Sequence, residues 1–360
     1  MQAPEKRAWV EIDLGALQRN AAAVAQRARA PLLPMIKADA YGLGATPVAR
    51  ALEPLDPWGY GVATILEGLE LRAAGITRPL VIFTPLGDDE LGDVRAAGLT
   101  PSLSRAESIE QWRRDGGGPW HLAIDTGMSR AGVRWDEVGG LSDVIGRCPP
   151  EGAYTHFHSA ELDDGSADVQ EERFRQALAS LPERPKLLHV ENSAAVARRH
   201  QSAWDCVRPG IFLYGVGSGE GTLVNPEPVV HVRARVIDLR RVRSGETVSY
   251  DATYRAVGDR RIATLGIGYA DGYPRSLSNR GCAILGDRRV SIAGLITMDM
   301  TMVDVTGVPC ALGDVATVIG DDPAPNVAAV ARASEMSPYE LLTGLRSRLA
   351  RVYRSEGVHA

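Results

Sequence analysis

The sequence predicts an α/β barrel of the (β/α)8 TIM type, followed by a mainly β C-terminal domain. Short apolar runs alternate with amphipathic stretches from residue 33 onward, which is typical of parallel βαβ units. Eight such runs suit a closed barrel better than an open doubly wound sheet. After Tyr214 the alternation stops, and a connector rich in glycine and proline leads into β-rich sequence. We therefore expect a barrel over residues 10–229 and a second domain over residues 230–360, which the extreme N-terminus joins.

The predicted barrel strands are eight short apolar runs separated by longer amphipathic or turn-rich stretches. In chain order they cover residues 32–37, 60–64, 80–84, 99–103, 120–125, 152–157, 186–190 and 207–215. Between them, helices are expected in five amphipathic segments, at residues 46–55, 65–75, 89–98, 105–115 and 167–181. The order of strand and helix is the one that a parallel barrel requires.

The C-terminal part is expected to be a separate β domain because its apolar runs have no intervening helices. Turn signals such as "RSGE" and "LGDR" separate these runs, which cover residues 229–242, 247–257, 260–269, 281–305 and 315–320. A short helical tail is expected over residues 326–345.

Composition excludes several classes of function. The net charge of −5 is mild and no block of basic residues is present, so neither nucleic acid nor an anionic membrane is an expected partner. The chain begins without an apolar run of signal-peptide length, and no later run is long enough to span a bilayer. Four widely spaced cysteines without CxxC spacing read as reduced thiols of a cytoplasmic protein rather than as disulfides or metal ligands: Cys148, Cys206, Cys282 and Cys310.

In a (β/α)8 barrel, the active site is built at the carboxyl ends of the strands. The residues expected there are cations, small hydroxyls and glycines: Lys37, Tyr41, Asp125, Arg130, His156, His158, His189, Asn192, Ser193, Arg208, Gly210 and Ile211. The set lacks the paired carboxylates of a glycosidase and the His/Asp cluster of a metal site. We therefore expect no metal.

Lys37 stands out because lysine is scarce in this arginine-rich chain and because it ends an apolar run. Burial would depress the pKa of its amine, and a neutral amine can form an imine with a carbonyl. Schiff-base aldolases and pyridoxal-phosphate enzymes both use such a lysine. The segments "NSAA" and "RPGI" favour the second class, because Ser193 and the N–H groups of Gly210 and Ile211 could bind a phosphate.

Each of these residues also has an ordinary structural interpretation. A single lysine at a strand end is most often a solvated charge, an arginine is often an ion-pair partner, and His156 could be a satisfied core histidine. The functional interpretation depends on their occurrence together at successive strand ends.

The sequence resembles a known family, the alanine racemases, which are fold-type III pyridoxal-phosphate-dependent amino-acid racemases. The resemblance covers nearly the whole chain and rests on eight ordered blocks: "MIKADAYGLGA", "DTGMSRAGV", "THFHSAE", "NSAA", "RPGIFLYG", "VSYDATY", "GIGYADGYPR" and "GLITMDMTMVDV". The family's fold is a barrel followed by a β domain, in agreement with the prediction above.

The resemblance implies two catalytic residues and a cofactor, pyridoxal 5'-phosphate. Lys37 would hold the cofactor and act as acid or base on one face of the substrate Cα. Tyr250 would act on the opposite face and would come from the partner subunit. The protein would therefore be a head-to-tail homodimer with shared active sites, in which the C-terminal domain contributes to the partner's site.

The remaining roles are also implied by the resemblance. Cofactor binding would involve Lys37, Tyr41, His156, Ser193, Arg208, Gly210 and Ile211, with Arg208 at the pyridine nitrogen and His156 behind it. Substrate binding would involve Arg130 and the backbone of Met298 at the carboxylate, with Tyr269 narrowing the entrance.

The chain departs from the family pattern at several positions around the substrate. Ala123 stands where many members have a carbamylated lysine that steers the carboxylate-binding arginine. Thr297 replaces a frequent cysteine, Leu295 an arginine, and Glu161 an aspartate at the entrance. A tyrosine that some members use on the phosphate corresponds to Ser347.

The function expected from the resemblance is interconversion of L-alanine and D-alanine by two-base proton transfer on an external aldimine, with D-alanine supplied to peptidoglycan. Because of the departures, a racemase of another small amino acid, or of several, stays open. A basic-amino-acid decarboxylase of the same fold is a weaker alternative, since "RPGI" and Tyr250 argue against it. A non-catalytic cofactor carrier and a cofactor-free aldolase are further alternatives.

Overall fold

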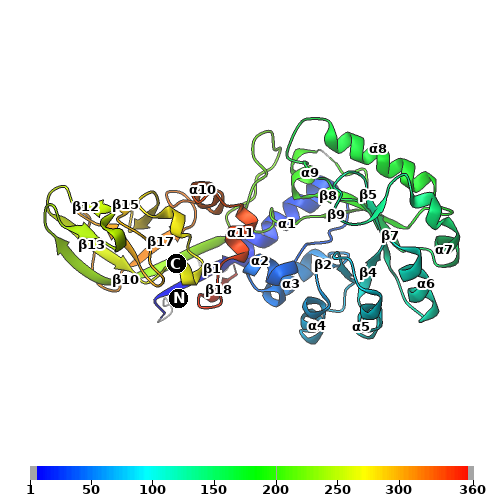
Figure 1. Ribbon diagram of the computed structural model, residues 1–360, viewed down its shortest axis with the longest axis horizontal. Helices are drawn as coiled ribbons and strands as arrows, with labels where there is room; N and C mark the ends of the chain where they lie inside the picture. Colours follow the sequence, from blue (N-terminus) through cyan, green and yellow to red (C-terminus); the bar gives the residue numbers. More distant parts are fainter. Residues whose placement is uncertain (1–5, 200, 356–360) are drawn as a thin grey trace.

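The computed structural model describes residues 6–199 and 201–355 and shows two lobes side by side (Figure 1). The parallel barrel with its surrounding helices forms one lobe, and the antiparallel β domain forms the other. The helices α1 (Leu14–Ala28) and α11 (Pro338–Thr343) lie between the lobes in this view. The first and last strands that the structure describes, β1 (Ala8–Asp13) and β18 (Ala350–Arg354), both belong to the sheet of the β domain.

The first lobe is a closed barrel of parallel strands. Its hydrogen-bonded order is β2 (Tyr60–Val62), β3 (Leu80–Ile82), β4 (Thr100–Leu103), β5 (His121–Asp125), β7 (Gly152–Tyr154), β8 (Leu187–Asn192) and β9 (Cys206–Arg208). Residues 32–36 take the eighth strand position, because Leu32 bridges to Val207 and Met35 bridges to Gly61, both in parallel. The predicted fold class is therefore confirmed.

Helices follow the barrel strands where amphipathic segments were predicted. They are α3 (Ala45–Leu52), α4 (Ile65–Ala73), α5 (Leu91–Ala96), α6 (Ala106–Arg114) and α8 (Ser166–Ala179). The start of α4 is set by a capping box, in which Thr64 accepts from the Glu67 N–H while the Glu67 carboxylate accepts from the Thr64 N–H.

The short helices α7 (Ser142–Arg147) and α9 (Ser193–Arg198) complete the ring of helices in places where the sequence pattern predicted none. The eighth apolar run is shorter as a strand than predicted. After Arg208 the chain forms a turn over residues 211–215, closed by bonds from the Leu213, Tyr214 and Gly215 N–H groups to preceding carbonyls.

The turn after Lys37 has an unusual backbone. In α2 (Lys37–Gly42), four consecutive residues have left-handed dihedrals, with φ between 51° and 59° from Ala38 to Tyr41. L-residues pay roughly 1–2 kcal/mol each for this conformation. The surrounding contacts hold it: the Ala38 N–H donates to Oε1 of Glu67 (2.8 Å), and the Ala45 N–H donates to Oδ1 of Asp39 (2.7 Å).

The second lobe is built around the long strand β10 (Val230–Val242), along which buried and half-buried residues alternate as expected for one face on a core. β10 pairs with β13 (Arg260–Leu265) and β17 (Val315–Ile319), which closes the sheet through β14 (Cys282–Leu285), β15 (Arg288–Ile292) and β16 (Thr301–Asp304). β1 (Ala8–Asp13) and β18 (Ala350–Arg354) extend the sheet beyond β10. A small hairpin is formed by β11 (Thr247–Val248) and β12 (Tyr254–Arg255).

The helical tail, α10 (Val327–Ala333) and α11, connects the β domain to the turn that follows Lys37. α11 packs against α2, and the guanidinium of Arg351 donates to the Gly42 carbonyl (2.8 Å) while the Tyr353 hydroxyl donates to that of Leu43 (3.0 Å). The position of the turn thus depends on both lobes. Among the residues described, no helix has the length and apolar character needed to cross a membrane.

Candidate active site

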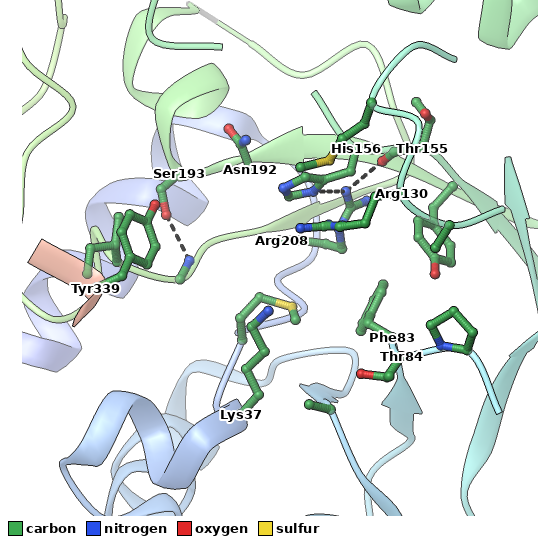
Figure 2. Close-up of a pocket in the computed structure, with 18 of the residues that line it drawn as sticks. Lys37, Phe83, Thr84, Arg130, Thr155, His156, Asn192, Ser193, Arg208 and Tyr339 are labelled. Atoms are coloured by element: carbon green, nitrogen blue, oxygen red, sulfur yellow. Dashed lines mark hydrogen bonds between the residues drawn. The ribbon is translucent and has the colours of Figure 1, made fainter. Parts of the chain in front are cut away.

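A cavity of about 600 Å³ opens at the carboxyl ends of the barrel strands (Figure 2). Ten of the twelve residues expected at the strand ends line it: Lys37, Tyr41, Asp125, Arg130, His156, Asn192, Ser193, Arg208, Gly210 and Ile211. The three long cationic side chains among them make the cavity positive. Such a cavity suits a ligand that carries phosphate or carboxylate groups.

Lys37 follows directly on the first strand position and extends toward Arg208 across the cavity (Figure 2). Burial lowers the pKa of its amine below the usual value, and the positive charge of Arg130 lowers it further, while Glu67 acts in the opposite direction. The neutral amine, which is the form that reacts with a carbonyl, is therefore favoured relative to an exposed lysine.

Arg208, at the end of β9, is 3% exposed and has no carboxylate partner among the described residues. Its terminal nitrogens donate to the carbonyl oxygens of Thr155 (2.7 Å) and Val190 (3.1 Å), among others. Burial lowers the pKa of Arg208 to about 10, which still leaves the guanidinium cationic near neutral pH. Of its five N–H groups, the one on Nε alone has no acceptor within the described part of the chain.

His156 lies beside Arg208, with Nδ1 3.3 Å from Nη2 of the arginine (Figure 2). Burial and the nearby positive charge of Arg208 lower the pKa of His156 to about 3, so the imidazole is neutral. Gln170 of α8 fixes this segment, because its amide nitrogen donates to the His156 carbonyl (3.0 Å). His158, the second histidine of the motif, is exposed, does not line the cavity and bonds to Ser159.

One end of the cavity collects hydrogen-bond donors. The Ser193 hydroxyl accepts from the N–H groups of Gly210 (2.8 Å) and Phe212 (3.3 Å), which leaves its own proton to donate outward. The Gly210 N–H, expected to face an anion, is thus used within the protein. The Ile211 N–H and the Tyr41 hydroxyl have no acceptor among the described residues.

Gly210 is required for this arrangement. A Cβ at that position would lie 2.4 Å from the Tyr41 hydroxyl, so a side chain would displace the phenol. The donors of Tyr41, Ser193 and Ile211 together form a cradle that fits a phosphate group without a lysine.

Arg130 is carried by a loop between β5 and β6 (Val133–Arg134). The carboxylate of Asp125 shapes this loop by accepting from the N–H groups of Gly127 (2.9 Å) and Ser129 (3.1 Å). The guanidinium of Arg130 makes no hydrogen bond or ion pair to the described residues and is directed at the cavity. Ala123, on β5, is 6% exposed and offers no group that could orient it.

The cavity also contains residues that the sequence analysis missed. Phe83 and Tyr154 form an aromatic wall, with ring centroids 4.9 Å apart, and the guanidinium of Arg208 lies 5.3 Å from the Tyr154 centroid. Phe83 directly follows β3 and Tyr154 is the last residue of β7, so a search of the strand ends could have found them. Tyr339 reaches the cavity from α11, with its ring 5.9 Å from that of Tyr41. No sequence pattern signals that a residue of the tail enters the barrel mouth.

Three of the residues that the resemblance implies do not line this cavity: Tyr250, Tyr269 and Met298. All belong to the β domain and are exposed, Tyr250 by 69%. Tyr250 lies between β11 and β12, and β12 lies at the end of the β domain remote from the barrel (Figure 1). Within one chain, therefore, Lys37 and Tyr250 are not brought together.

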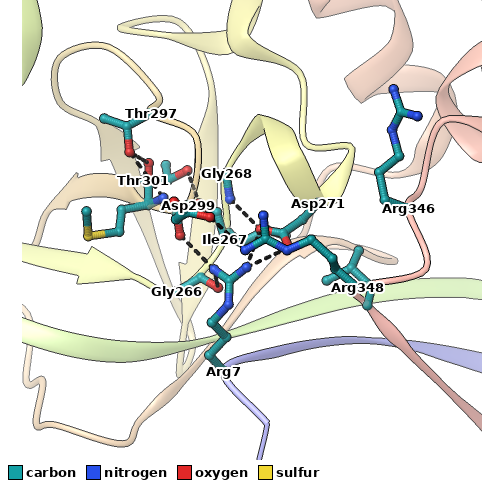
Figure 3. A network of polar contacts seen from close by, with 12 residues as sticks. Arg7, Gly266, Ile267, Gly268, Asp271, Thr297, Asp299, Thr301, Arg346 and Arg348 are labelled. Atoms are coloured by element: carbon teal, nitrogen blue, oxygen red, sulfur yellow. Dashed lines mark hydrogen bonds and ion pairs between the residues drawn. The ribbon is translucent and has the colours of Figure 1, made fainter.

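A polar network fixes the loops that carry Tyr269 and Met298 (Figure 3). The Tyr269 N–H donates to the Thr297 carbonyl (3.1 Å), which ties the two loops together. Asp271, 1% exposed, accepts two bonds from Arg7 (2.7 and 3.0 Å), and its second oxygen accepts from the Gly268 N–H (2.9 Å). The Met298 N–H has no acceptor among the described residues, so it is available to a ligand.

Two family models match the chain. The model described as "Alanine racemase, N-terminal domain" matches residues 12–218, and the model "Alanine racemase, C-terminal domain" matches residues 229–353. Relatives with this name include the alanine racemase of Deinococcus radiodurans, 39% identical over 96% of this chain and 98% of the relative. Another, from Symbiobacterium thermophilum, is 35% identical over 97% of both chains.

Solved structures of similar proteins agree with this match. The alanine racemase of Bacillus anthracis with bound L-Ala-P has a TM-score of 0.91 and 29% identity, covering 99% of this chain and 97% of its own. The alanine racemase of Bartonella henselae, which contains covalently bound pyridoxal phosphate, has a TM-score of 0.89 and 30% identity, covering 97% of this chain and 100% of its own.

Proposed function

The chain belongs to the alanine racemase family, and from this membership we propose that it interconverts L-alanine and D-alanine with pyridoxal 5'-phosphate as cofactor. It is an amino-acid racemase of the pyridoxal-phosphate-dependent type. The observation that carries the choice of racemisation over decarboxylation is the cavity in which the Lys37 amine faces a guanidinium without a carboxylate partner among the described residues. The D-alanine formed would supply peptidoglycan precursors.

The donor set of the cavity fits the cofactor. Tyr41, Ser193 and the Ile211 N–H would hold its phosphate, and the free Nε–H of Arg208 would donate to its ring nitrogen. His156 would support the guanidinium from behind, through the 3.3 Å contact of Nδ1 with Nη2. The Gly210 backbone contributes by giving the Tyr41 phenol room, since a Cβ there would lie 2.4 Å from its oxygen.

When bound, pyridoxal 5'-phosphate makes the Cα proton of the attached amino acid acidic by acting as an electron sink. Lys37 would take or return this proton at Nζ on one face of the carbon, as its lowered pKa allows. Tyr250 would do so at its phenol oxygen on the opposite face. Two such groups on opposite faces give the simplest route to inversion, because each enantiomer is then deprotonated by a different residue.

Arg208 would influence the reaction through its charge. An arginine does not give up its proton to the ring nitrogen, since its pKa stays far above neutral pH. The ring is then a weaker electron sink than beside a carboxylic acid, which would restrain competing reactions of the same cofactor. The absence of any carboxylate partner to Arg208 within the described residues supports this assignment.

The substrate carboxylate would be held by two donors that have no acceptor among the described residues. One is the guanidinium of Arg130 in the barrel cavity, and the other is the Met298 N–H on the β domain. Tyr269 would narrow the entrance beside Met298. Because Met298, Tyr269 and Tyr250 lie on the β domain and outside the cavity of their own chain, they would come from a second copy. The active form would then be a head-to-tail homodimer with two shared sites.

A second candidate function is racemisation of another small amino acid, or of several. It is favoured by the uncharged Leu295 and Thr297, which stand where the family often has an arginine and a cysteine and which would lie at the entrance of the partner copy's site. The Thr297 hydroxyl donates to the Met300 carbonyl (3.1 Å). A decarboxylase of the same fold is a weaker alternative, because those enzymes place an acidic residue at the ring nitrogen.

The four cysteines are free thiols, which supports a cytoplasmic location.

One experiment tests the proposal against its alternatives. The purified protein is incubated in deuterated water with single enantiomers of alanine, serine and larger amino acids, and chiral chromatography and Cα deuterium uptake are measured. Inversion with deuterium uptake, fastest on alanine, is expected. Faster inversion of another amino acid would establish the second candidate, and loss of carbon dioxide would establish the decarboxylase.

A further inference from the structure

Two histidines behind Arg208 have no role in the proposal so far. Nη1 of Arg208 lies 2.9 Å from Nδ1 of His189 on β8, and Nε2 of His189 lies 2.9 Å from Nδ1 of His121 on β5. Both histidines are fully buried. The three side chains thus form a continuous hydrogen-bonded chain from the cavity into the barrel interior.

The direction of this chain follows from the donor inventory. A guanidinium can only donate, so Nδ1 of His189 must be an acceptor. The proton of a neutral His189 ring then resides on Nε2 and is donated to Nδ1 of His121. The proton of His121 therefore resides on its Nε2. One cation thereby determines the tautomer of two imidazoles.

The surroundings favour the neutral form of both rings. Burial is the main cause that lowers the pKa of His121 to about 3 and that of His189 well below its usual value, and the charge of Arg208 acts in the same direction. Packing holds the rings in place: His189 stacks on Tyr154 with 5.1 Å between centroids and 15° between planes. Gly152 makes room for His121, since a Cβ there would lie 2.9 Å from the imidazole.

The chain ends at the opposite side of the barrel from the cavity. Nε2 of His121 is buried without a hydrogen-bond partner among the described residues, and Oε2 of Glu151, just before β7, lies 3.9 Å away. The Glu151 side chain is 36% exposed. The series therefore runs from Arg208 at the carboxyl ends of the strands to the amino ends, close to solvent.

Building on the proposed function, we propose that His189 and His121 are positioning residues that hold the guanidinium of Arg208 so that its Nε–H is left for the cofactor ring nitrogen. His189 accepts a hydrogen bond from Nη1 of Arg208. His121 in turn accepts from His189 and so keeps that ring in the orientation and tautomer that the bond to Arg208 requires. His121 touches neither cofactor nor substrate, because it does not line the cavity.

Neutron crystallography of the perdeuterated full-length protein tests the direction of the chain. Deuterium is expected on Nε2 and not on Nδ1 of both His189 and His121. A deuterium on Nδ1 of His189 would overturn the proposal, since that atom could not accept from Arg208. This measurement does not depend on turnover.

Substitution of His121 tests the positioning role. His121→Phe keeps an aromatic ring but removes the acceptor, and the dissociation constant for pyridoxal 5'-phosphate, followed by visible absorbance, is expected to rise roughly tenfold, the worth of about one hydrogen bond. His121→Gln is expected to restore most of the affinity, since its amide oxygen can accept from His189. Trp120→Phe, next to His121 and equally buried, is the matched control and should bind as the unmodified protein does.

The outcomes separate this proposal from the proposed function. Equal weakening in Trp120→Phe and His121→Phe would mean a general loosening of the barrel and would overturn the positioning role, as would full affinity in His121→Phe. Failure of the unmodified protein to bind the cofactor or to racemise alanine would instead overturn the proposed function, whatever the deuterium positions are.

Discussion

Lys37 is sensitive to the charges around it because its amine is partly desolvated. Burial and Arg130 both lower its pKa, so the neutral amine is populated at lower pH than in an exposed lysine. The rate at which the amine combines with an aldehyde rises with pH as this group loses its proton, and it levels off above the pKa.

Arg130→Gln removes one of the three influences that lower the pKa of Lys37, which are burial, Arg130 and Arg208, so this pKa is expected to rise. The pH at which cofactor loading reaches half its maximal rate should therefore move upward. The loading rate at each pH is measured by stopped-flow absorbance after the cofactor-free protein is mixed with pyridoxal 5'-phosphate. Arg134→Gln, four residues away and paired with Asp136, is the control and should leave the profile in place. A profile of Arg130→Gln that stays in place or moves downward would contradict the proposed coupling.

Tyr250→Phe removes only the phenol oxygen. If that oxygen carries the proton on one face of the substrate, conversion should fall roughly 10²–10⁴-fold in both directions, since each direction uses both groups. Chiral chromatography from either enantiomer measures the loss, and the visible spectrum of bound cofactor should be unchanged because Lys37 is intact. Full activity would remove Tyr250 from the mechanism.

At the residue scale, the sequence placed Lys37, Arg208 and Ser193 at the ends of barrel strands within recognisable motifs, and the structure brings them to one cavity. The sequence did not draw attention to His121, for which we propose a positioning role. A histidine near the start of a strand, on the side of the barrel away from the cavity, has no signal of its own. Its relevance emerges only when β5 and β8 place it against His189.

The elements of the barrel were predicted from apolar runs, and all eight strand positions were found. The short helices α7 and α9 were missed because no longer amphipathic segment surrounds their six residues, whereas the equally short α5 lies within the predicted segment 89–98. The left-handed turn after Lys37 was beyond sequence reasoning for a different reason. Three of its four left-handed residues are Ala38, Ala40 and Tyr41, whose intrinsic preference opposes this backbone.

The loops of the β domain depend on a single buried carboxylate. This carboxylate is that of Asp271, whose Oδ1 lies 2.7 Å from Nη2 of Arg7 and 3.4 Å from Nε of Arg348 (Figure 3). Asp271→Asn removes the negative charge between these two arginines. We expect a loss of about 1–3 kcal/mol in the free energy of unfolding, because a buried charged acceptor is weakened for two arginines at once. Urea denaturation measures this loss. The control is Glu110→Gln at an exposed pair with Arg113, and its midpoint should stay unchanged. Equal midpoints for the two variants would contradict the prediction.

At the scale of the whole molecule, the main feature is the separation between the cavity and the predicted second acid/base. The β domain carries Tyr250 away from the barrel of its own chain (Figure 1). The proposed site shared between two copies would resolve this separation, and the order of the eight motifs along the chain could not reveal such sharing. The motifs give the order of the residues along one chain, and they do not indicate which copy of the protein contributes each residue to a site.

Co-expression of Lys37→Ala with Tyr250→Phe tests the shared site. Each variant alone should be inactive, but a mixed dimer would contain one intact site, with Lys37 from one copy and Tyr250 from the other. With equal expression, about a quarter of the sites should be intact, so about a quarter of the activity should return. Differently tagged copies allow the mixed dimer to be purified. No activity in that dimer would place both residues in the same chain.

The left-handed turn after Lys37 has a consequence that concerns stereochemistry. Ala38 and Ala40 have φ of 52° and 51° and ψ of 48° and 51°, the mirror image of the ordinary helical region. An alanine of the opposite chirality would favour this backbone by about as much as the natural one disfavours it. If the proposed reaction is correct, the enzyme's own product is the monomer that these two positions would accommodate best, although the ribosome cannot insert it. Chemical ligation of a peptide with inverted alanines at 38 and 40 should therefore give a protein that unfolds at a higher temperature.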